Sequence, residues 1–457
     1  MKRKMLVIPM VLLAAGLMGC ATNAEDKPDV EDTSNVESAS NIEDTSNAEG
    51  GSNAEEKPYE GTKIVVGCEA GGAFTEFYKS AAPEFTEQTG IDVEFFEIAH
   101  ANTHDRFLTE ALAGTGSIDV YQLDQPWVSE FASLGYLEPV SEEMKAQVDD
   151  FDDFSESGLA TMSYDGVLYG LPFQYHTPIL FYRSDIFEEA GLEPPTTWDE
   201  YREIAKTLTN KEEGFYGTCL EGAAVLEPVT HFLDKILQAG GNYWDEETGE
   251  VTFDSEAARD ALNWMYAIQN EDQSSPEGAL GYENGDVYNL FLEGRLAMVS
   301  EWPYFYAGAQ DPEQSTIVGK VKVAPQPMNV ENTSGLWAFG HGVTAASKNK
   351  GAAWLFCVWS TSKDILTRFS ISQTTPNVRA SSMEAVLESS EVPDDIKEVL
   401  RVINDACLRA KPVTNTEHFP AVQERLSLTL SNVLSGSTTI EDEVAATQAE
   451  LEEIFSD

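Results

Sequence analysis

The chain contains few basic residues for its length. Of its 457 residues, 28 are Lys or Arg and 79 are Asp or Glu, which gives a formal net charge of −51 at pH 7. Binding of nucleic acid by phosphate neutralisation requires a basic surface, and this chain would be repelled by another polyanion. Electrostatic attachment to anionic lipids is disfavoured for the same reason. Nucleic acid is therefore not expected as a partner.

Common enzyme motifs are also missing. The segment after the first predicted strand, Gly67 to Gly72 (GCEAGG), lacks the Lys-Ser/Thr pair of a nucleotide loop, and Glu69 would repel a phosphate. The chain has no Gly-x-Ser-x-Gly elbow and no His-Glu-x-x-His motif. Paired carboxylates could hydrolyse a glycoside, but such pairs arise by chance in so acidic a chain. We expect no catalysis and no cofactor.

Cysteine is scarce, with five residues in the whole chain. Cys20 belongs to the N-terminal segment considered below, and the other four are Cys68, Cys219, Cys357 and Cys407. Apolar segments surround these four residues. Disulfides, with three possible connectivities, and buried free thiols both stay open.

The six histidines include one pair with a spacing that suits a metal. His100 and His104 are four residues apart, which can place two imidazoles on one face of a helix. However, Asn102-Thr103 is a natural helix start, so His100 precedes the helix, and the sequence shows no third ligand. We expect no bound metal, and a receptor for metal ions stays as a minor alternative.

The first twenty residues have the pattern of a secretion signal. Lys2 to Lys4 form a basic start, and the apolar run Leu6 to Met18 is short for a membrane span. The segment ends in Gly19-Cys20, which resembles the lipobox of bacterial lipoproteins. The resemblance implies that Cys20 is acylated and becomes the mature N-terminus, and two acyl chains give a stable anchor. An ordinary cleaved signal followed by a free Cys20 is the alternative.

Residues 21–60 are rich in Glu, Asp, Ser, Asn and Thr and almost free of aromatics. Such a segment cannot bury enough apolar surface to fold, so we expect a disordered acidic linker. As a flexible tether it would span about 35 Å. The full chain contains 42% hydrophobic residues, and the part after residue 60 is long enough for two or three domains.

Strand and helix patterns alternate from Gly61 onward. Strands are predicted at 63–67, 91–96 and 118–123, and helices at 74–88, 103–113, 198–208, 229–239 and 255–270. After residue 347 the pattern is mainly helical. Strands that alternate with helices predict an α/β fold with a mostly parallel sheet and helices on both faces.

Several motifs carry a family resemblance. They are GVLYGLP at 166–172, ILFYRSDIF at 179–187, PTTWDE at 195–200, FLEGRLAM at 291–298 and AASKNK at 345–350. In this order, and beside a lipobox, they resemble the extracellular solute-binding proteins of ABC importers, in particular the sugar- and oligosaccharide-binding group. The resemblance covers about 390 residues.

The resemblance implies a two-lobed periplasmic-binding-protein-like fold of type II. Crossover strands would join the lobes, and the lobes would close on ligand as a hinge. Lobe 1 would comprise residues 61–172 plus 327–363, and lobe 2 residues 173–326 plus 364–457. The protein would be a monomeric, lipid-anchored receptor on the outer face of the cytoplasmic membrane, of Gram-positive type. It would deliver a carbohydrate to the permease subunits.

Ligand-binding residues are expected beyond the carboxyl ends of strands. The loops there combine aromatic with polar side chains, which suits sugars because C–H faces stack on rings while hydroxyls form hydrogen bonds. The candidates are Asp124, Gln125, Trp127, Gln174, Tyr175, His176, Glu301, Trp302, Tyr304, Trp337 and Arg379.

Each candidate also has a purely structural interpretation. Tyr175 and Trp337 could pack in the lobe cores, and so could Phe339, a further aromatic residue beside Trp337. Asp124, Gln174 and Glu301 could cap the helices that follow them. A surface salt bridge is the alternative role of Arg379. The acidic loop residues would also suit a cationic ligand, so a polyamine receptor is the main alternative function.

Overall fold

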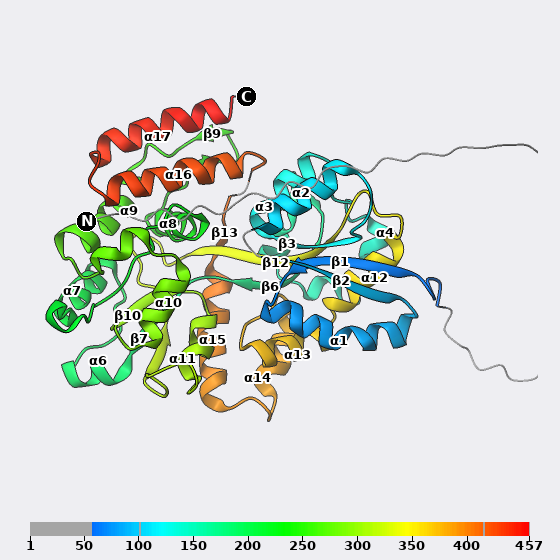
Figure 1. The fold of residues 1–457 in the computed structure, drawn as a ribbon, viewed down its shortest axis with the longest axis horizontal. Coiled ribbons are helices and arrows are strands. Elements are labelled where there is room, and N and C mark those ends of the chain that lie inside the picture. Colours follow the sequence, from blue (N-terminus) through cyan, green and yellow to red (C-terminus); the bar gives the residue numbers. More distant parts are fainter. Residues whose placement is uncertain (1–56, 100–101, 415, 457) are drawn as a thin grey trace, which may run out of the picture. The chain divides into compact units, whose positions relative to one another are not determined.

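A computed structural model describes residues 57–99, 102–414 and 416–456 of the chain (Figure 1). The predicted lipidation site Cys20, the linker up to residue 56 and His100 lie outside the described residues. The part from Glu56 to Asp457 forms one compact unit. Within it, the alternation of strands and helices begins at Lys63, as predicted.

The larger sheet has six strands within the described residues. Its order is β13-β12-β3-β1-β2, and β6 also pairs with β12. The strands are β1 (Lys63–Glu69), β2 (Asp92–Ile98), β3 (Val120–Asp124), β6 (Leu171–His176), β12 (Gly335–Val343) and β13 (Lys411–Pro412). In Figure 1 the long strand β12 runs alongside both β6 and β3. This strand therefore connects segments that are far apart in the sequence.

The smaller sheet has the order β10-β7-β11. Its strands are β7 (Ile179–Arg183), β10 (Met298–Glu301) and β11 (Val321–Ala324). Two two-stranded ribbons complete the described strands, formed by β4 (Ser163–Tyr164) with β5 (Val167–Leu168) and by β8 (Trp244–Asp245) with β9 (Glu250–Val251).

The expectation of a mostly parallel sheet is only partly correct. β1 pairs in parallel with β2 and β3, as βαβ connections require. β12 is antiparallel to β3 and β6, and both neighbours of β7 are antiparallel to it. The sequence predicted the strands that are joined through a helix, which are parallel. It could not predict the direction of β12, which pairs with strands far away in the chain.

The helices cover these sheets. They are α1 (Ala73–Thr89), α2 (Thr103–Ala113), α3 (Gln125–Ser133), α4 (Glu142–Lys145), α5 (Glu156–Thr161), α6 (Ser184–Ala190), α7 (Trp198–Leu208), α8 (Leu226–Gln238), α9 (Glu256–Tyr266), α10 (Asn284–Leu292), α11 (Tyr304–Gln310), α12 (Lys350–Ser360), α13 (Lys363–Gln373), α14 (Ala380–Glu388), α15 (Asp394–Arg409), α16 (Phe419–Leu434) and α17 (Ile440–Ile454). α2 and α7 have the predicted bounds. α1 ends where Gly90 takes a left-handed conformation with φ 74°, and Thr197 and Glu200 form a capping box at the start of α7.

The position of α13 and α14 changes the expected lobe boundary. Phe369 of α13 packs against Phe74 and Tyr78 of α1, with ring centroids 5.8 Å apart in both pairs. α14 in turn packs on α13, and Figure 1 shows α13 beside α1. We therefore propose that lobe 1 continues through residue 388 and does not end at residue 363.

The four cysteines of the described residues are buried free thiols. Burial raises the pKa of the Cys68 thiol to about 11, so the unreactive thiol form prevails at neutral pH. Of the two options left open by the sequence, buried thiols are the one observed. None of the helices in the described residues combines the length and apolar character that a membrane crossing requires.

Candidate functional site

A cavity of about 230 Å³ lies at the ends of the central strands. The ends of β3, β6 and β10 contribute to its lining, and so does β12. The starts of α1, α3 and α11 also contribute, together with one residue of α8 and one residue after α13. The lining residues are Phe74, Asp124, Pro126, Gln174, His176, Thr230, Trp302, Pro303, Tyr304, Trp337, Phe339 and Thr375. We call this cavity the ligand pocket.

Aromatic rings form a connected wall of the ligand pocket. His176 stacks on Phe339 with ring centroids 5.6 Å apart and meets the edge of Trp302 at 5.0 Å. Phe339 also contacts Phe74 at 5.3 Å. Such a wall offers flat apolar faces to a ligand, and each good ring contact contributes on the order of 1 kcal/mol.

Polar groups complete the wall. The Gln174 Nε2 atom donates to Thr375 Oγ1 at 2.8 Å. The Gln174 Oε1 and His176 Nδ1 atoms are buried and have no hydrogen-bond partner among the described residues. Since buried polar atoms normally have partners, these two favour a ligand that carries hydroxyl groups.

The ligand pocket has little charge. Among the lining residues that the structure describes, Asp124 is the one acidic residue, and there is no Lys or Arg. Burial lowers the pKa of His176 to about 4, so this ring is neutral at pH 7. A ligand carboxylate would therefore find no cation here, and a ligand with several ammonium groups would find one carboxylate.

The structure brings six of the eleven predicted binding residues together in the ligand pocket. They are Asp124, Gln174, His176, Trp302, Tyr304 and Trp337. Five of them lie at or just beyond the end of a strand, and Trp337 lies on β12 opposite His176 at the end of β6. Their role in binding stays a proposal.

Three predicted residues lie elsewhere for packing reasons. Gln125 faces a second cavity and donates from Nε2 to the carbonyl of Val413 at 3.1 Å. The ring of Trp127 packs on Phe107 in the core, with centroids 6.2 Å apart. Tyr175 is 3% exposed and donates its hydroxyl to Asn404 Oδ1 at 3.1 Å. Alternation along a strand explains the last case, because Gln174 and His176 face the pocket side and Tyr175 points to the opposite face.

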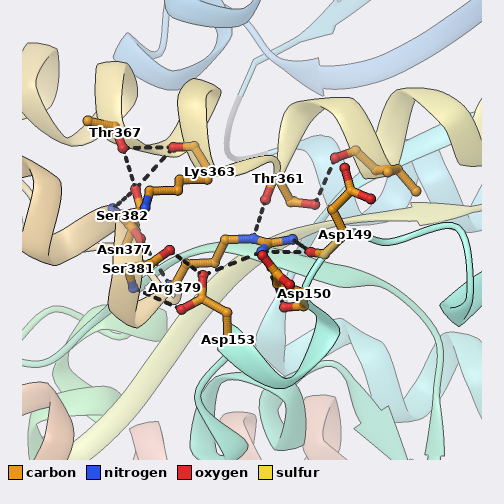
Figure 2. Close-up of polar contacts among 11 residues, drawn as sticks. Asp149, Asp150, Asp153, Thr361, Lys363, Thr367, Asn377, Arg379, Ser381 and Ser382 are labelled. Carbon is orange, nitrogen blue, oxygen red and sulfur yellow. Dashed lines mark hydrogen bonds and ion pairs between the residues drawn. The ribbon is translucent and has the colours of Figure 1, made fainter.

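Arg379 is also outside the ligand pocket. Figure 2 shows its guanidinium among backbone carbonyls and acidic residues. Nε donates to the carbonyl of Thr361 at 2.8 Å, Nη1 and Nη2 each donate to that of Asp149 at 3.0 Å, and Asp153 is 3.4 Å away. Arg379 is 3% exposed. Its salt bridge is therefore buried and structural, and we withdraw Arg379 from the binding set.

Glu301 lies behind the wall and not in it. It is 2% exposed and shares a small separate cavity with Glu221 and His231. The Asn284 Nδ2 atom donates to both carboxylates, at 2.8 Å to Glu221 and 2.9 Å to Glu301. Burial and the charge of Glu221 raise the pKa of Glu301 to about 8. Glu301 thus supports Trp302, the next residue, from behind.

Sequence reasoning missed several lining residues. Phe74 follows the carboxyl end of β1, so the same rule that selected Asp124 could have found it. Phe339 was considered from the sequence with core packing as its alternative and was not selected, although it lies two residues after Trp337 on the same face of β12. Thr230 and Thr375 follow no strand end, and no local pattern pointed to them.

A family model described as bacterial extracellular solute-binding protein matches residues 71–365. The chain belongs to this family. It is therefore an extracellular solute-binding protein, in agreement with the resemblance of its motifs. A pocket walled by rings and unpartnered polar atoms, with a single charged side chain, fits the binding of a solute.

Two relatives each share 26% identity with the chain. One is a probable amino-acid ABC transporter periplasmic-binding protein of Sinorhizobium fredii, matched over 69% of this chain and 72% of its own length. The other is the mannitol-binding protein of Pseudomonas aeruginosa, matched over 75% and 81%. Among solved structures, maltose-bound MalE3 of T. maritima has a TM-score of 0.77 and 26% identity, over 86% of this chain and 100% of its own. The expected two-lobed α/β fold class of type II is confirmed.

Replacing Arg379 tests its structural role. The variant Arg379→Gln leaves the carbonyls of Asp149 and Thr361 without their donors, so we expect a loss of about 3 kcal/mol in unfolding free energy. Urea unfolding measures this loss, and affinity for the ligand should change less than twofold. A stable variant with strongly weakened binding would return Arg379 to the binding set.

Acidification should destabilise the protein in part through His176. The ordinary pKa of histidine is about 6.5, and that of His176 is about 4. Between about pH 6.5 and pH 4 the unfolded chain therefore takes up a proton at this ring, while the folded chain does not. Stability is lost as pH falls through this window, by roughly 2 kcal/mol for a ring that lines a pocket. Urea unfolding at about pH 7.5 and pH 4.5 should show that His176→Gln loses less stability than the native chain.

A second histidine gives a control of opposite sign. Burial alone would lower the pKa of His104, but its hydrogen bond to Glu130, 2.6 Å from Nε2 to Oε2, outweighs burial and raises it. A raised pKa stabilises the fold at low pH, so His104→Gln should lose more stability on acidification than the native chain. Equal acid sensitivity of His176→Gln and the native chain would contradict the assignment.

Proposed function

We propose that this protein is the receptor of an ABC importer for a neutral sugar or polyol. The observation that carries the proposal is the ligand pocket, whose described lining has rings, unpartnered polar atoms, one carboxylate and no Lys or Arg. Hydroxyl-rich neutral ligands need ring faces and hydrogen bonds and no counter-ion. The mannitol-binding relative and the maltose-bound structure are consistent with this class.

The pocket also favours a small ligand. Its volume of about 230 Å³ is below the roughly 300–1,000 Å³ of pockets for drug-sized molecules. We therefore propose a single sugar unit or a short polyol as the bound group. Uronic acids and amino acids are disfavoured, because Arg379 is elsewhere and His176 is neutral.

A receptor role would use both sides of the pocket. Lobe 1 as redefined above contributes Asp124 and Phe339, and lobe 2 contributes Thr230 and Trp302. A ligand that touches both stabilises the closed state relative to the open one. The permease subunits would then recognise the closed monomer, and the sugar would leave chemically unchanged, since we propose no catalysis.

The N-terminal segment would hold this receptor at the membrane. We propose that Cys20 is acylated at the outer face of the cytoplasmic membrane and that residues 21–60 separate the folded part from it. The motif Gly19-Cys20 after an apolar run supports this proposal. Two acyl chains would make the attachment stable.

A ligand panel tests the function. Neutral sugars and polyols, uronic acids, amino acids and polyamines are compared by thermal melting and calorimetry. A ligand at 100 times its dissociation constant adds about 2.7 kcal/mol of stability. We expect a shift only with neutral polyhydroxy ligands. The substitution Trp302→Ala should weaken that ligand at least about tenfold, because it removes a ring of the wall.

Trp244→Ala is the matched control. The Trp244 ring stacks on Phe455 at 4.0 Å and lines the second cavity, so its loss should leave affinity within about twofold. A shift with amino acids or polyamines alone would overturn the carbohydrate assignment and leave the family assignment intact.

Cell fractionation tests the anchor. The native chain should sediment with membranes and partition into detergent, whereas Cys20→Ala should be released, because it has no thiol to acylate. Export of both forms is checked by protease treatment of intact cells. A native chain found entirely in the medium would show that the signal is cleaved without lipidation.

A further inference from the structure

Three ionisable side chains from distant segments meet behind the wall of the ligand pocket. Glu221 precedes α8, His231 lies on α8, and Glu301 ends β10. Their ligand atoms all lie within 4.8 Å of one another. Glu221 is 4% and Glu301 2% exposed, so both carboxylates have lost most of their hydration. A buried pair of carboxylates needs positive charge close by.

The surrounding residues supply little of that charge. Among the described residues, His231 is the one cationic side chain that forms an ion pair with Glu221 or Glu301. Lys235 lines the same cavity, but its Nζ is held by Asp234 at 3.0 Å and Gln326 at 2.5 Å. In the metal-free protein the raised pKa values of Glu301 and His231 favour a proton on each of these side chains. A divalent cation that displaces both protons would balance both carboxylates.

The distances suit ligands of a shared ion. The His231 Nε2 atom is 3.5 Å from Glu301 Oε2 and 3.7 Å from Glu221 Oε1. Both values exceed ordinary hydrogen-bond lengths. Two ligand atoms that each lie about 2.0–2.1 Å from one metal, at an angle of about 120°, are about 3.5 Å apart. By contrast, His104 and Glu130 form a direct hydrogen bond of 2.6 Å.

Unpartnered atoms are found around the same cavity. Glu221 Oε2, His231 Nε2 and Ser300 Oγ are buried without a hydrogen-bond partner among the described residues, and all three residues line the cavity. Its volume is about 30 Å³, enough for one or two water-sized occupants. The cavity thus has room for an ion and one completing water.

We propose that Glu221, His231 and Glu301 bind one divalent transition-metal ion of the Zn²⁺ or Mn²⁺ type. One imidazole and two carboxylates form a mixed nitrogen and oxygen set that these ions accept, whereas Mg²⁺ and Ca²⁺ prefer oxygen ligands alone. The site differs from the His100 and His104 pair considered from the sequence.

The ion would also support the ligand pocket. Glu301 precedes Trp302, whose ring lies 5.4 Å from that of His231. Asn284 holds both carboxylates and accepts a hydrogen bond from the hydroxyl of Tyr304, a residue of the pocket lining. A bound metal would therefore fix the backing of Trp302 and Tyr304. By linkage, metal would tighten ligand binding, and ligand would tighten metal binding by the same factor.

Metal titration of the full chain tests the site. Protein without an affinity tag is stripped with chelator and titrated with Zn²⁺ and with Mn²⁺ in about 1 mM Ca²⁺, which occupies weak acidic surface sites. We expect one saturable equivalent and a rise of about 3 °C in melting temperature at 100 times the dissociation constant. Glu301→Gln and His231→Gln should each weaken this equivalent at least about 100-fold.

His104→Gln is the matched control, since His104 also lies between two acidic side chains but at a half-buried site in another part of the fold. This variant should keep the equivalent. Absence of a saturable equivalent in the native chain, or its retention in His231→Gln, would overturn the proposal. Should the ligand variants fail to fold, retention of Zn²⁺ by the native chain after gel filtration decides. A native chain that retains no Zn²⁺, while His104→Gln also retains none, would reject the site.

Discussion

The pairing of β12 with β3 on one side and β6 on the other determines where the ligand pocket forms. In this register Phe339 lies opposite both Asp124 and Gln174, and Trp337 lies opposite His176. Five residues of the pocket wall are thus cross-strand partners. A slip of one residue would turn Trp337 and Phe339 to the opposite face of the sheet. The strand also links both hydrophobic cores, since Leu336 belongs to one and Trp337 to the other.

The charge of the pocket contrasts with that of the chain. A formal charge of −51 surrounds a cavity whose lining includes a single carboxylate. The acidity of the chain therefore says little about its ligand. It describes surface residues and the N-terminal segment, where charge favours solubility and opposes self-association. The proposed preference for a neutral ligand rests on the rings and polar side chains at a few strand ends.

Local sequence patterns predicted the elements well. Alternating apolar runs and a closing Gly90 located β1, α1 and α2 because these signals act over a few residues. The strand-end rule placed Asp124, Gln174 and Trp302 in the pocket. It could not decide which way a side chain turns, and Tyr175 and Trp127 consequently belong to the cores.

Long-range contacts were beyond reach of the sequence. The Arg379 guanidinium donates to the carbonyl of Asp149, which lies 230 residues earlier in the chain. Glu221, His231 and Glu301 come together from segments that share no motif. The direction of β12 was equally hidden, because nothing local records which strands it meets. The family resemblance predicted the overall fold. The contacts of Arg379 and of the Glu221, His231 and Glu301 cluster became known only from the structure.

Two glycines on β12 limit how this receptor can diversify. A side chain at Gly340 would meet the sulfur of Met162 at 2.6 Å and the carbonyl of Leu171 at 2.9 Å, and one at Gly342 would meet Leu123 at 2.6 Å. Substitution there would separate the strands that hold the pocket together. Positions 337 and 339, in contrast, present their side chains to the ligand pocket. We therefore expect changes in ligand specificity to occur at positions such as 337 and 339, while Gly340 and Gly342 stay glycine so that the strands can pair.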